Sequence, residues 1–273
     1  MPSTLFPHSF EFCCLASGSS GNCHYFGSEE AGILIDAGIS TRRIKKSLDE
    51  IGKEIDRIKA VFITHDHIDH IGSLTRLTKR YKIPVYCTEG TWKGILRNPK
   101  TFDVNPDMFV EVQPGETYMA GGFAVEAFTV SHDAHGPVGY HISNSVKSIT
   151  LATDLGFIGD DAAKHLRNCD AMILESNYDE NMLLSGSYPE HLKQRIHGPM
   201  GHLCNNDTSL FIADNYRPEI SHIVLGHLSA ENNTPDKALE TLLSTMKSKG
   251  VQVNGTIIKA LARGERSELY VLG

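Results

Sequence analysis

The chain has 273 residues, 40% of them hydrophobic, and a formal net charge of −7 at pH 7. That length is ordinary for one layered α/β domain, and no linker or repeat divides it, so we expect a single domain over residues 1–273. It has no basic leader segment and no apolar run near 18 residues, so neither export nor a membrane span is expected. Its six cysteines form no CxxC pair, which is typical of reduced thiols in a cytoplasmic protein.

Strand-like and helix-like segments alternate along the chain, the pattern of an α/β fold. Ser40 or Thr41 is a suitable N-cap for the first helix. Thr234 followed by Pro235 is a suitable start for the last helix, because proline at the first helical position lacks only an amide that would be unsatisfied anyway. Gly198 predicts a helix end. We expect strands at 10–16, 22–26, 32–36, 59–64, 84–87, 108–112, 122–130, 137–142, 148–153, 170–175 and 220–225, and helices at 40–51, 73–80, 189–197, 205–214 and 235–249.

The segment Thr64–His70 reads Thr-His-Asp-His-Ile-Asp-His and follows a strand-like apolar run. Burying so many ionisable groups without partners is costly, and metal ions would remove that cost. His65 and His67 lie two apart, so in an extended loop both side chains leave the same side of the chain and could bind one ion. Asp69 and His70 could bind a second, since imidazole and carboxylate suit zinc. A charged surface turn is the alternative.

Four further polar residues each end an apolar or β-branched run: Asp36, His132, Asp154 and His227. With the His-x-His-x-Asp-His run they match, in order, the five motifs of the metallo-β-lactamase superfamily. The chain therefore resembles that superfamily over residues 33–228. Finer features resemble the bacterial YycJ/WalJ-type group, which lies near the RNase Z-like phosphodiesterases. They occur at Ala16–Asn22, Glu175–Tyr178, Gly201–Asn206 and His227–Asn233.

The resemblance implies a four-layer αββα sandwich, the metallo-β-lactamase fold, with the metal ligands on loops at one edge. It also implies two divalent metal ions, with zinc the first expectation and manganese or iron the alternatives. By this resemblance one ion is bound by His65, His67 and His132, and the other by Asp69, His70 and His227. Asp154 bridges the two ions, and Asp36 braces the segment Thr64–His70, which we call the metal loop.

Four residues outside the ligand set are candidates for supporting roles. His202 lies 25 residues before His227 and resembles the separate histidine that phosphodiesterase members place over the leaving group; a histidine at a helix start is the alternative. Glu175 ends an apolar strand and could orient such a histidine, or it could cap a neighbouring helix. Ser19 and Asn22 lie in a glycine-containing turn whose amides could bind a substrate phosphate, although a tight hairpin explains the turn as well.

The remaining histidines need no role in catalysis. His135 stands three residues after His132 in a glycine-containing loop and could contact a substrate. His222 lies within an apolar strand and is expected to be a packing residue. Surface or packing positions are also expected for His8, His24, His165, His191 and His197.

The metal motifs and His202 together predict a binuclear-metal hydrolase, with Asp69 and His202 as catalytic residues. A hydroxide that bridges two divalent ions exists at neutral pH, because the ions lower the pKa of water toward about 7. Asp69 could aim this hydroxide, and a protonated His202 could donate to the departing oxygen. We expect a phosphodiesterase or nuclease, with exonuclease activity suggested for some members of the group that the chain resembles.

Two other functions stay open. The same metals could hydrolyse thioester, lactone or β-lactam bonds, although Asp154 stands where true β-lactamases often have cysteine. A non-catalytic partner in cell-wall regulation is the second alternative, and the intact ligand set counts against it. The net charge of −7 opposes nucleic-acid binding overall, but bound divalent ions and the basic segments 42–46 and 79–82 would offset it locally. The expected partner is a phosphodiester substrate, nucleic acid included, and not a membrane.

Overall fold

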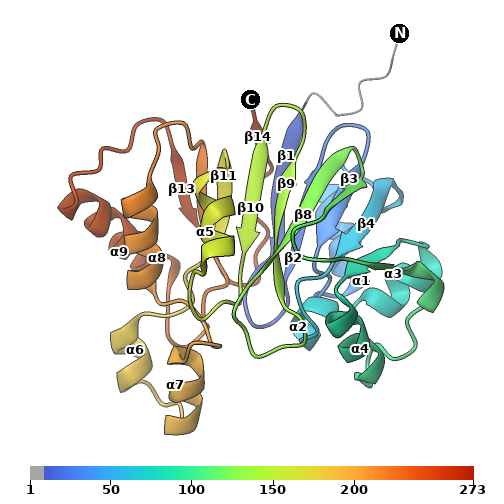
Figure 1. Ribbon diagram of the computed structural model, residues 1–273, viewed down its shortest axis with the longest axis horizontal. Coiled ribbons are helices and arrows are strands. Elements are labelled where there is room, and N and C mark those ends of the chain that lie inside the picture. Colours follow the sequence, from blue (N-terminus) through green and yellow to red (C-terminus); the bar gives the residue numbers. More distant parts are fainter. Residues whose placement is uncertain (1–8) are drawn as a thin grey trace. The chain divides into compact units, whose positions relative to one another are not determined.

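The computed structural model describes residues 9–273, so His8 lies outside the described residues (Figure 1). The described chain forms two compact units. Unit 1 comprises the residues through Phe128 together with Ala134–Lys147 and Gly264–Gly273, and unit 2 comprises Thr129–Asp133 and Ser148–Arg263. The single domain expected over residues 1–273 stays a prediction. No helix within residues 9–273 is both long and apolar enough to cross a membrane.

Unit 1 contains a mixed seven-stranded sheet in the order β14-β1-β2-β3-β4-β5-β6. Pairing is antiparallel from β14 to β3 and parallel from β3 to β6. Strands β1, β2 and β3 are buried along their whole length, which is why they read as nearly continuous apolar runs. The bounds are Phe10–Ala16 (β1), Cys23–Gly27 (β2), Gly32–Ile35 (β3), Ile58–Phe62 (β4), Val85–Cys87 (β5), Phe109–Glu111 (β6) and Tyr270–Leu272 (β14).

Helix α1 follows β3, and helices α2 and α3 follow β4, the two strands of this sheet that lead into polar motifs. Helix α1 begins where predicted, because the hydroxyl of its N-cap Ser40 accepts the backbone N–H of Arg43 at 3.3 Å. Apolar side chains such as Ile44 on α1 and Leu77 on α3 lie in one buried core with the strand residue Val61. The other elements that begin in unit 1 are Thr41–Glu50 (α1), Ile68–Ile71 (α2), Leu74–Arg80 (α3), Glu89–Arg97 (α4), Thr117–Ala120 (β7), Phe123–Thr129 (β8) and Val138–Ser143 (β9), with short 3-10 turns at Ile55–Arg57 and Pro106–Met108.

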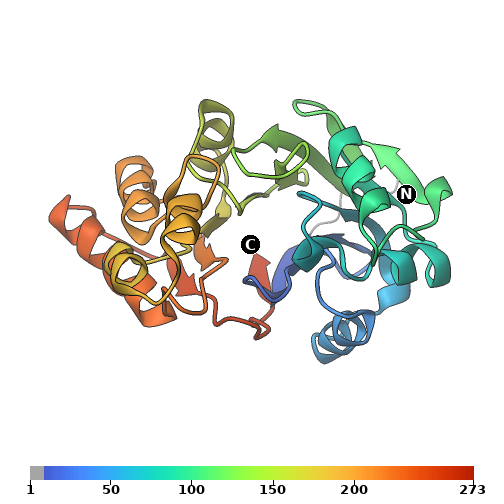
Figure 2. The same cartoon turned by 90° about the horizontal axis from the view of Figure 1, so that it is seen from below.

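Unit 2 is built on four parallel strands in the order β13-β12-β11-β10. Helices α8 and α9 pack side by side, as Figures 1 and 2 show. Helix α9 begins at Pro235 after its N-cap Thr234, and α7 ends before Gly198, both as predicted. The bounds are Ser148–Ala152 (β10), Ala171–Glu175 (β11), His222–Gly226 (β12), Ile257–Ala260 (β13), Asp160–Arg167 (α5), Glu180–Ser185 (α6), Glu190–His197 (α7), Asn205–Asn215 (α8) and Pro235–Ser248 (α9).

Helix α4 is an element that the sequence pattern does not predict, because its two glycines lower helix propensity. A Cβ atom at Gly94 would lie 1.9 Å from Oδ2 of Asp66. At Gly90 it would lie 3.2 Å from the backbone nitrogen of Gly136. The glycines therefore allow α4 to approach both the loop after β4 and the loop before β9. Also missing from the prediction are α2, α5, α6, β7, β13 and β14.

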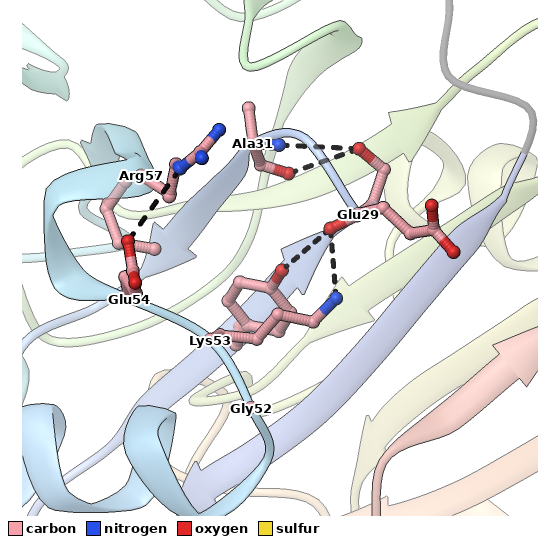
Figure 3. Close-up of a pocket in the computed structure, with 9 residues that line it drawn as sticks. Glu29, Ala31, Gly52, Lys53, Glu54 and Arg57 are labelled. Atoms are coloured by element: carbon pink, nitrogen blue, oxygen red, sulfur yellow. Dashed lines mark hydrogen bonds and ion pairs between the residues drawn. The ribbon is translucent and has the colours of Figure 1, made fainter.

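A small cavity of unit 1 lies beside β2 and is lined by Tyr25, Lys53, Glu54 and Arg57, among others (Figure 3). The two cations of this cavity face carboxylates. Lys53 forms an ion pair with Glu11, and Nε of Arg57 lies 3.8 Å from a carboxylate oxygen of Glu54. The cavity therefore offers little net positive charge to a ligand.

The close contact at Gly38 gives a prediction about stability. A Cβ atom at this position would lie 1.5 Å from the backbone oxygen of Asp69, so the metal loop has to move if a methyl group is added. We expect Gly38→Ala to lower the free energy of unfolding by about 3 kcal/mol, measured by urea denaturation. Gly159→Ala is the control, since its Cβ would make only an ordinary contact of 3.5 Å with Phe157. Equal stability of the two variants would contradict the packing argument.

Candidate metal centre

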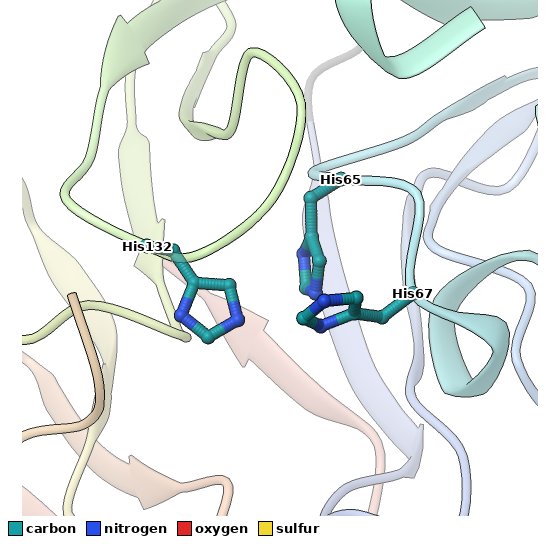
Figure 4. Close-up of side chains that lie close together, drawn as sticks. All are labelled: His65, His67 and His132. Carbon is teal, nitrogen blue, oxygen red and sulfur yellow. The ribbon is translucent and has the colours of Figure 1, made fainter. Parts of the chain in front are cut away.

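In unit 1 the loop after β4 and the short helix α2 bring three imidazoles together. The ring centroids of His65 and His67 lie 4.6 Å apart (Figure 4), and those of His65 and His70 lie 4.0 Å apart. His65 and His70 are buried, and the side chain of Asp69 is 24% exposed. Imidazole and carboxylate are donors that zinc prefers, so the chemistry of this set fits a divalent metal.

Asp36, the first residue after β3, holds this loop in place. Its side chain is fully buried, and Oδ1 accepts the backbone N–H of Thr64 at 2.9 Å and the Thr64 hydroxyl at 3.0 Å. Its Oδ2 lies 2.8 Å from Nδ1 of His70. A proton on Nδ1 is therefore donated to Asp36, which leaves Nε2 of His70 unprotonated, the form that can accept a hydrogen bond or bind a metal.

The predicted substrate turn is tied to the same loop. The backbone N–H of Asn22 donates to the backbone oxygen of Asp69 at 2.8 Å. The buried Asn22 amide accepts the backbone N–H of Gly18 at 2.8 Å, and its Nδ2 lies 2.9 Å from Nε2 of His70. Ser19, by contrast, is exposed. The turn thus has one side chain directed into the metal loop and one at the surface.

In unit 2, Glu175 at the end of β11 organises a second cluster. One ligand atom from each of Asp154, Glu175, His202 and His227 lies within 4.8 Å of the others. Oε1 of the fully buried Glu175 lies 2.8 Å from Nδ1 of His202 and 2.9 Å from Nδ1 of His227. Its Oε2 accepts the backbone N–H of Leu155 at 2.9 Å. Both rings direct Nδ1 toward the same oxygen, so Nε2 is the nitrogen that each directs away from Glu175.

His132 belongs to the same unit as this cluster. Its Nδ1 lies 3.2 Å from the carbonyl oxygen of Gly201, and its Nε2 lies 3.8 Å from Oδ1 of Asp154. The centroid of its ring is 5.3 Å from that of His202. Unit 2 therefore brings Asp154, His202 and His227 around the carboxylate of Glu175, with His132 beside Asp154 and His202.

The electrostatics of the Glu175 cluster favour a charged pair. Burial alone would lower the pKa of His202, but the neighbouring carboxylate of Glu175, followed by that of Asp154, outweighs burial and raises this pKa to about 9. Burial alone would likewise raise the pKa of Glu175, but His202 and His227 outweigh it and hold this pKa below its usual value. In metal-free protein His202 is therefore protonated at neutral pH while Glu175 is ionised.

Backbone strain is concentrated at the residues that the motifs single out. Within residues 9–273, the non-glycine residues with positive φ are Asp36 (62°), Lys82 (56°), Asp154 (58°) and His227 (53°). Asp36 and His227 directly follow β3 and β12, and Asp154 is the second residue after β10. Such conformations cost on the order of 1–3 kcal/mol each and persist where surrounding contacts enforce them.

Two residues of this region are not identified by sequence reasoning. Nδ2 of Asn177 donates to the carbonyl oxygen of His227 at 2.8 Å and lies 3.3 Å from Oε1 of Glu175. Oδ2 of Asp66 lies 2.9 Å from Nδ1 of His135, which ties that exposed histidine to the metal loop. The signals were the position of Asn177 just after a strand-ending glutamate and that of Asp66 inside the histidine run.

Comparison with known proteins decides the family. Residues 32–227 match the model of the beta-lactamase superfamily domain. The chain belongs to this superfamily. Over 242 residues it is 35% identical to exodeoxyribonuclease YycJ of Bacillus anthracis, which covers 89% of this chain and 91% of that protein. It is 36% identical to exodeoxyribonuclease WalJ of Streptococcus pneumoniae over 237 residues, 87% of this chain and 88% of that protein.

A solved structure shows the same fold. The metallo-β-lactamase fold protein YhfI of Bacillus subtilis matches with a TM-score of 0.69 and 13% identity, over 96% of this chain and 99% of that one. The predicted fold is thus confirmed as two mixed β-sheets flanked by helices. The predicted resemblance to the YycJ/WalJ-type group is confirmed as well, and the chain is a hydrolytic enzyme of this superfamily.

The contact between Glu175 and His202 gives a prediction about titration. In EDTA-treated protein, Glu175→Gln should lower the pKa of His202 from about 9, because the variant removes the carboxylate that favours the imidazolium. Histidine NMR signals followed against pH measure this change.

The pH dependence of folding stability follows from the difference in the pKa of His202 between the folded and unfolded states. The folded-state pKa is raised above the ordinary value of 6.5, so the contribution of this pair is complete below pH 6.5 and is lost as pH rises through about 9. The variant should therefore flatten the fall in stability of the metal-free protein over that range. An unchanged pKa of His202 in the variant would show that Glu175 is not its cause.

Proposed function

We propose that this chain is a metal-dependent phosphodiesterase that acts as a nuclease. The observation that carries this proposal is the pair of His202 and buried Glu175 beside Asp154 and His227. A phosphodiester releases an alkoxide, whose departure requires a proton at neutral pH, whereas a thioester releases a thiolate of much lower basicity. A histidine paired with a buried carboxylate next to the proposed metal ligands is suited to donate that proton, which favours phosphodiesters over thioesters.

We propose the ligand set that the order of the five motifs implies, with two divalent ions and zinc as the first expectation. The donor chemistry of each unit supports it, since both units gather imidazoles and carboxylates. His65, His67 and His132 would hold one ion; Asp69, His70 and His227 would hold the other; Asp154 would bridge them. Asp36 and Glu175 would orient ligands by accepting hydrogen bonds from Nδ1 of His70 and His227.

When bound, the two ions would supply Lewis acidity to the phosphoryl oxygens and would make water a nucleophile at neutral pH. Asp69 lies at the start of α2 with its carboxylate partly exposed, so it can accept a hydrogen bond from the attacking water and orient it. His202 donates its proton to the departing oxygen, and Glu175 stabilises the imidazolium before the transfer. This chain's residues therefore supply orientation at the attacking side and a proton at the leaving side.

The finer proposal is an exonuclease that acts on DNA. Two relatives that align over most of this chain are named exodeoxyribonucleases, and this supports a DNA substrate and action from a strand end. The net charge of −7 places a condition on such a substrate: the chain must bind it through local positive charge and bound metal.

Metal content tests the ligand set. We expect close to two transition-metal ions per chain by elemental analysis of purified protein, because each set of donors fits one divalent ion. Zinc added to EDTA-treated protein should raise the melting temperature, since a ligand that binds only the folded state stabilises it. Protein that stays metal-free after zinc addition and melts at an unchanged temperature would contradict the assignment.

The leaving group tests the role of His202. His202→Ala should retain both metals and lose about 10²–10⁴-fold in kcat on an oligonucleotide, whose leaving alkoxide needs a proton. The loss on bis-p-nitrophenyl phosphate should be small, because p-nitrophenolate departs without one. His191→Ala is the control, since His191 is an exposed histidine on α7.

Three results would count against this role. Equal losses on both substrates would leave His202 with a positioning function. Loss of metal from the variant would make it a ligand. No hydrolysis of either substrate by the metal-loaded wild-type protein would overturn the proposed function itself.

A further inference from the structure

A groove of about 470 Å³ lies between the start of α1 and helix α3 in unit 1. Three of its lining residues are cations, Arg76, Lys79 and Arg80, and no carboxylate lines it. This composition departs from that of the whole chain, in which 33 acidic residues outnumber 26 basic ones. We call these three cations, with the groove that they line, the α3 basic groove.

The positions of the three cations on one helix explain why they act together. They stand at i, i+3 and i+4 of α3, so their side chains leave the same face of the helix. All three are exposed. Their charges therefore add to a single patch of positive potential on the surface of a chain that is otherwise acidic.

Two of the three cations are not neutralised by the protein. Neither Arg76 nor Arg80 forms an ion pair within residues 9–273; Arg80 lies 5.4 Å from the ring centroid of Tyr81. Lys79 pairs with Asp103, but both side chains are about half exposed, and exposed pairs of this kind are weak and exchangeable. The contrast is with Lys53 of the cavity in Figure 3, whose ion pair with Glu11 is largely buried.

The α3 basic groove begins where the metal loop ends. Gly72 and Ser73, which also line it, follow the proposed ligand His70 by two and three residues. The backbone N–H of Ser73 donates to the carbonyl oxygen of Ala37 at 2.8 Å, and this fixes the junction between the groove and the loop after β3. Ser40 and Thr41, from the end of the same loop and the start of α1, also line the groove and add hydroxyl groups.

We propose that the α3 basic groove binds the backbone phosphates of a single-stranded nucleic acid. The inference rests on the proposed function. A nucleic-acid strand with one phosphodiester bond at the metal site would continue into the groove beside the metal loop. Arginine guanidinium groups bind phosphate oxygens in pairs of hydrogen bonds, and serine and threonine hydroxyls add neutral donors. Several cations in a row suit a polymer with repeated phosphates better than a small diester, which occupies the metal site alone.

The experiment measures binding of the nucleic-acid strand separately from hydrolysis of a phosphodiester bond. Binding of a fluorescein-labelled oligothymidylate is measured in EDTA at NaCl concentrations between about 50 and 200 mM for wild-type protein and for the Arg76→Gln/Arg80→Gln variant. Hydrolysis of bis-p-nitrophenyl phosphate by the metal-loaded proteins is measured in parallel. The matched control is Lys45→Gln/Lys46→Gln, which removes two charges from neighbouring α1, where both lysines pair with carboxylates one turn away.

We expect the arginine variant to bind the oligonucleotide at least about tenfold more weakly at low salt and to lower the salt slope by about 1.4, since each phosphate contact on a single strand contributes about 0.7. Its activity on bis-p-nitrophenyl phosphate should match wild type. Affinity and slope equal to those of the lysine control would overturn the proposal, as would the absence of any binding by wild-type protein. Failure of the metal-loaded wild type to hydrolyse the small diester would count against the proposed function alone, because the binding measurement requires neither metal nor turnover.

Discussion

The arrangement of unit 2 depends on one buried carboxylate. Glu175 has no exposed surface, and an ionised carboxylate in that position is stable only if partners replace the water that it has lost. Two imidazoles and the backbone N–H of Leu155 provide that replacement. Because His202 and His227 face the same oxygen, the orientation of the proposed proton donor is coupled to that of a proposed metal ligand. The strand β11 thus positions two functions with one side chain.

Unit 1 applies the same principle with a shorter side chain. Asp36 is fully buried at the end of β3 and satisfies its oxygens with Thr64 and His70, which lie on the metal loop. Each unit therefore has a buried strand-end carboxylate that fixes the Nδ1 atom of a histidine and determines which nitrogen is directed elsewhere. A substitution at either carboxylate would disturb a proposed ligand without touching a metal.

The sequence predicted those parts of the fold that depend on local signals. The apolar strands, the caps at Ser40 and Thr234, and the motif residues at strand ends all follow from neighbouring residues, and the family resemblance supplied the layered architecture. Helix α4 escaped prediction because Gly94 serves a tertiary contact with Asp66 at the expense of helix propensity. The short strands β13 and β14 escaped because their pairing partners, β12 and β1, lie far away in the sequence.

In the candidate site as well, the sequence predicted features that depend on local residues but not those that depend on tertiary contacts. Residue type and spacing identified the histidines and aspartates, but not which nitrogen each imidazole directs toward its carboxylate. Glu175 was expected to orient one histidine or to cap a helix, and it faces both His202 and His227. The amide of Asn177 and the pair of Asp66 and His135 were missed because a polar residue after a strand is common and its contacts depend on distant segments.

The left-handed backbone at Asp36, Asp154 and His227 has a consequence for how this enzyme can be improved. Each of these residues occupies a conformation that glycine adopts at no steric cost, so the chain gives up folding stability at three strand ends to hold reactive side chains there. Stability and activity therefore compete at these positions. An engineer who seeks a more heat-resistant enzyme has to find the gain elsewhere, in surface helices and loops, because relaxing these three turns would remove the groups for which the strain is maintained.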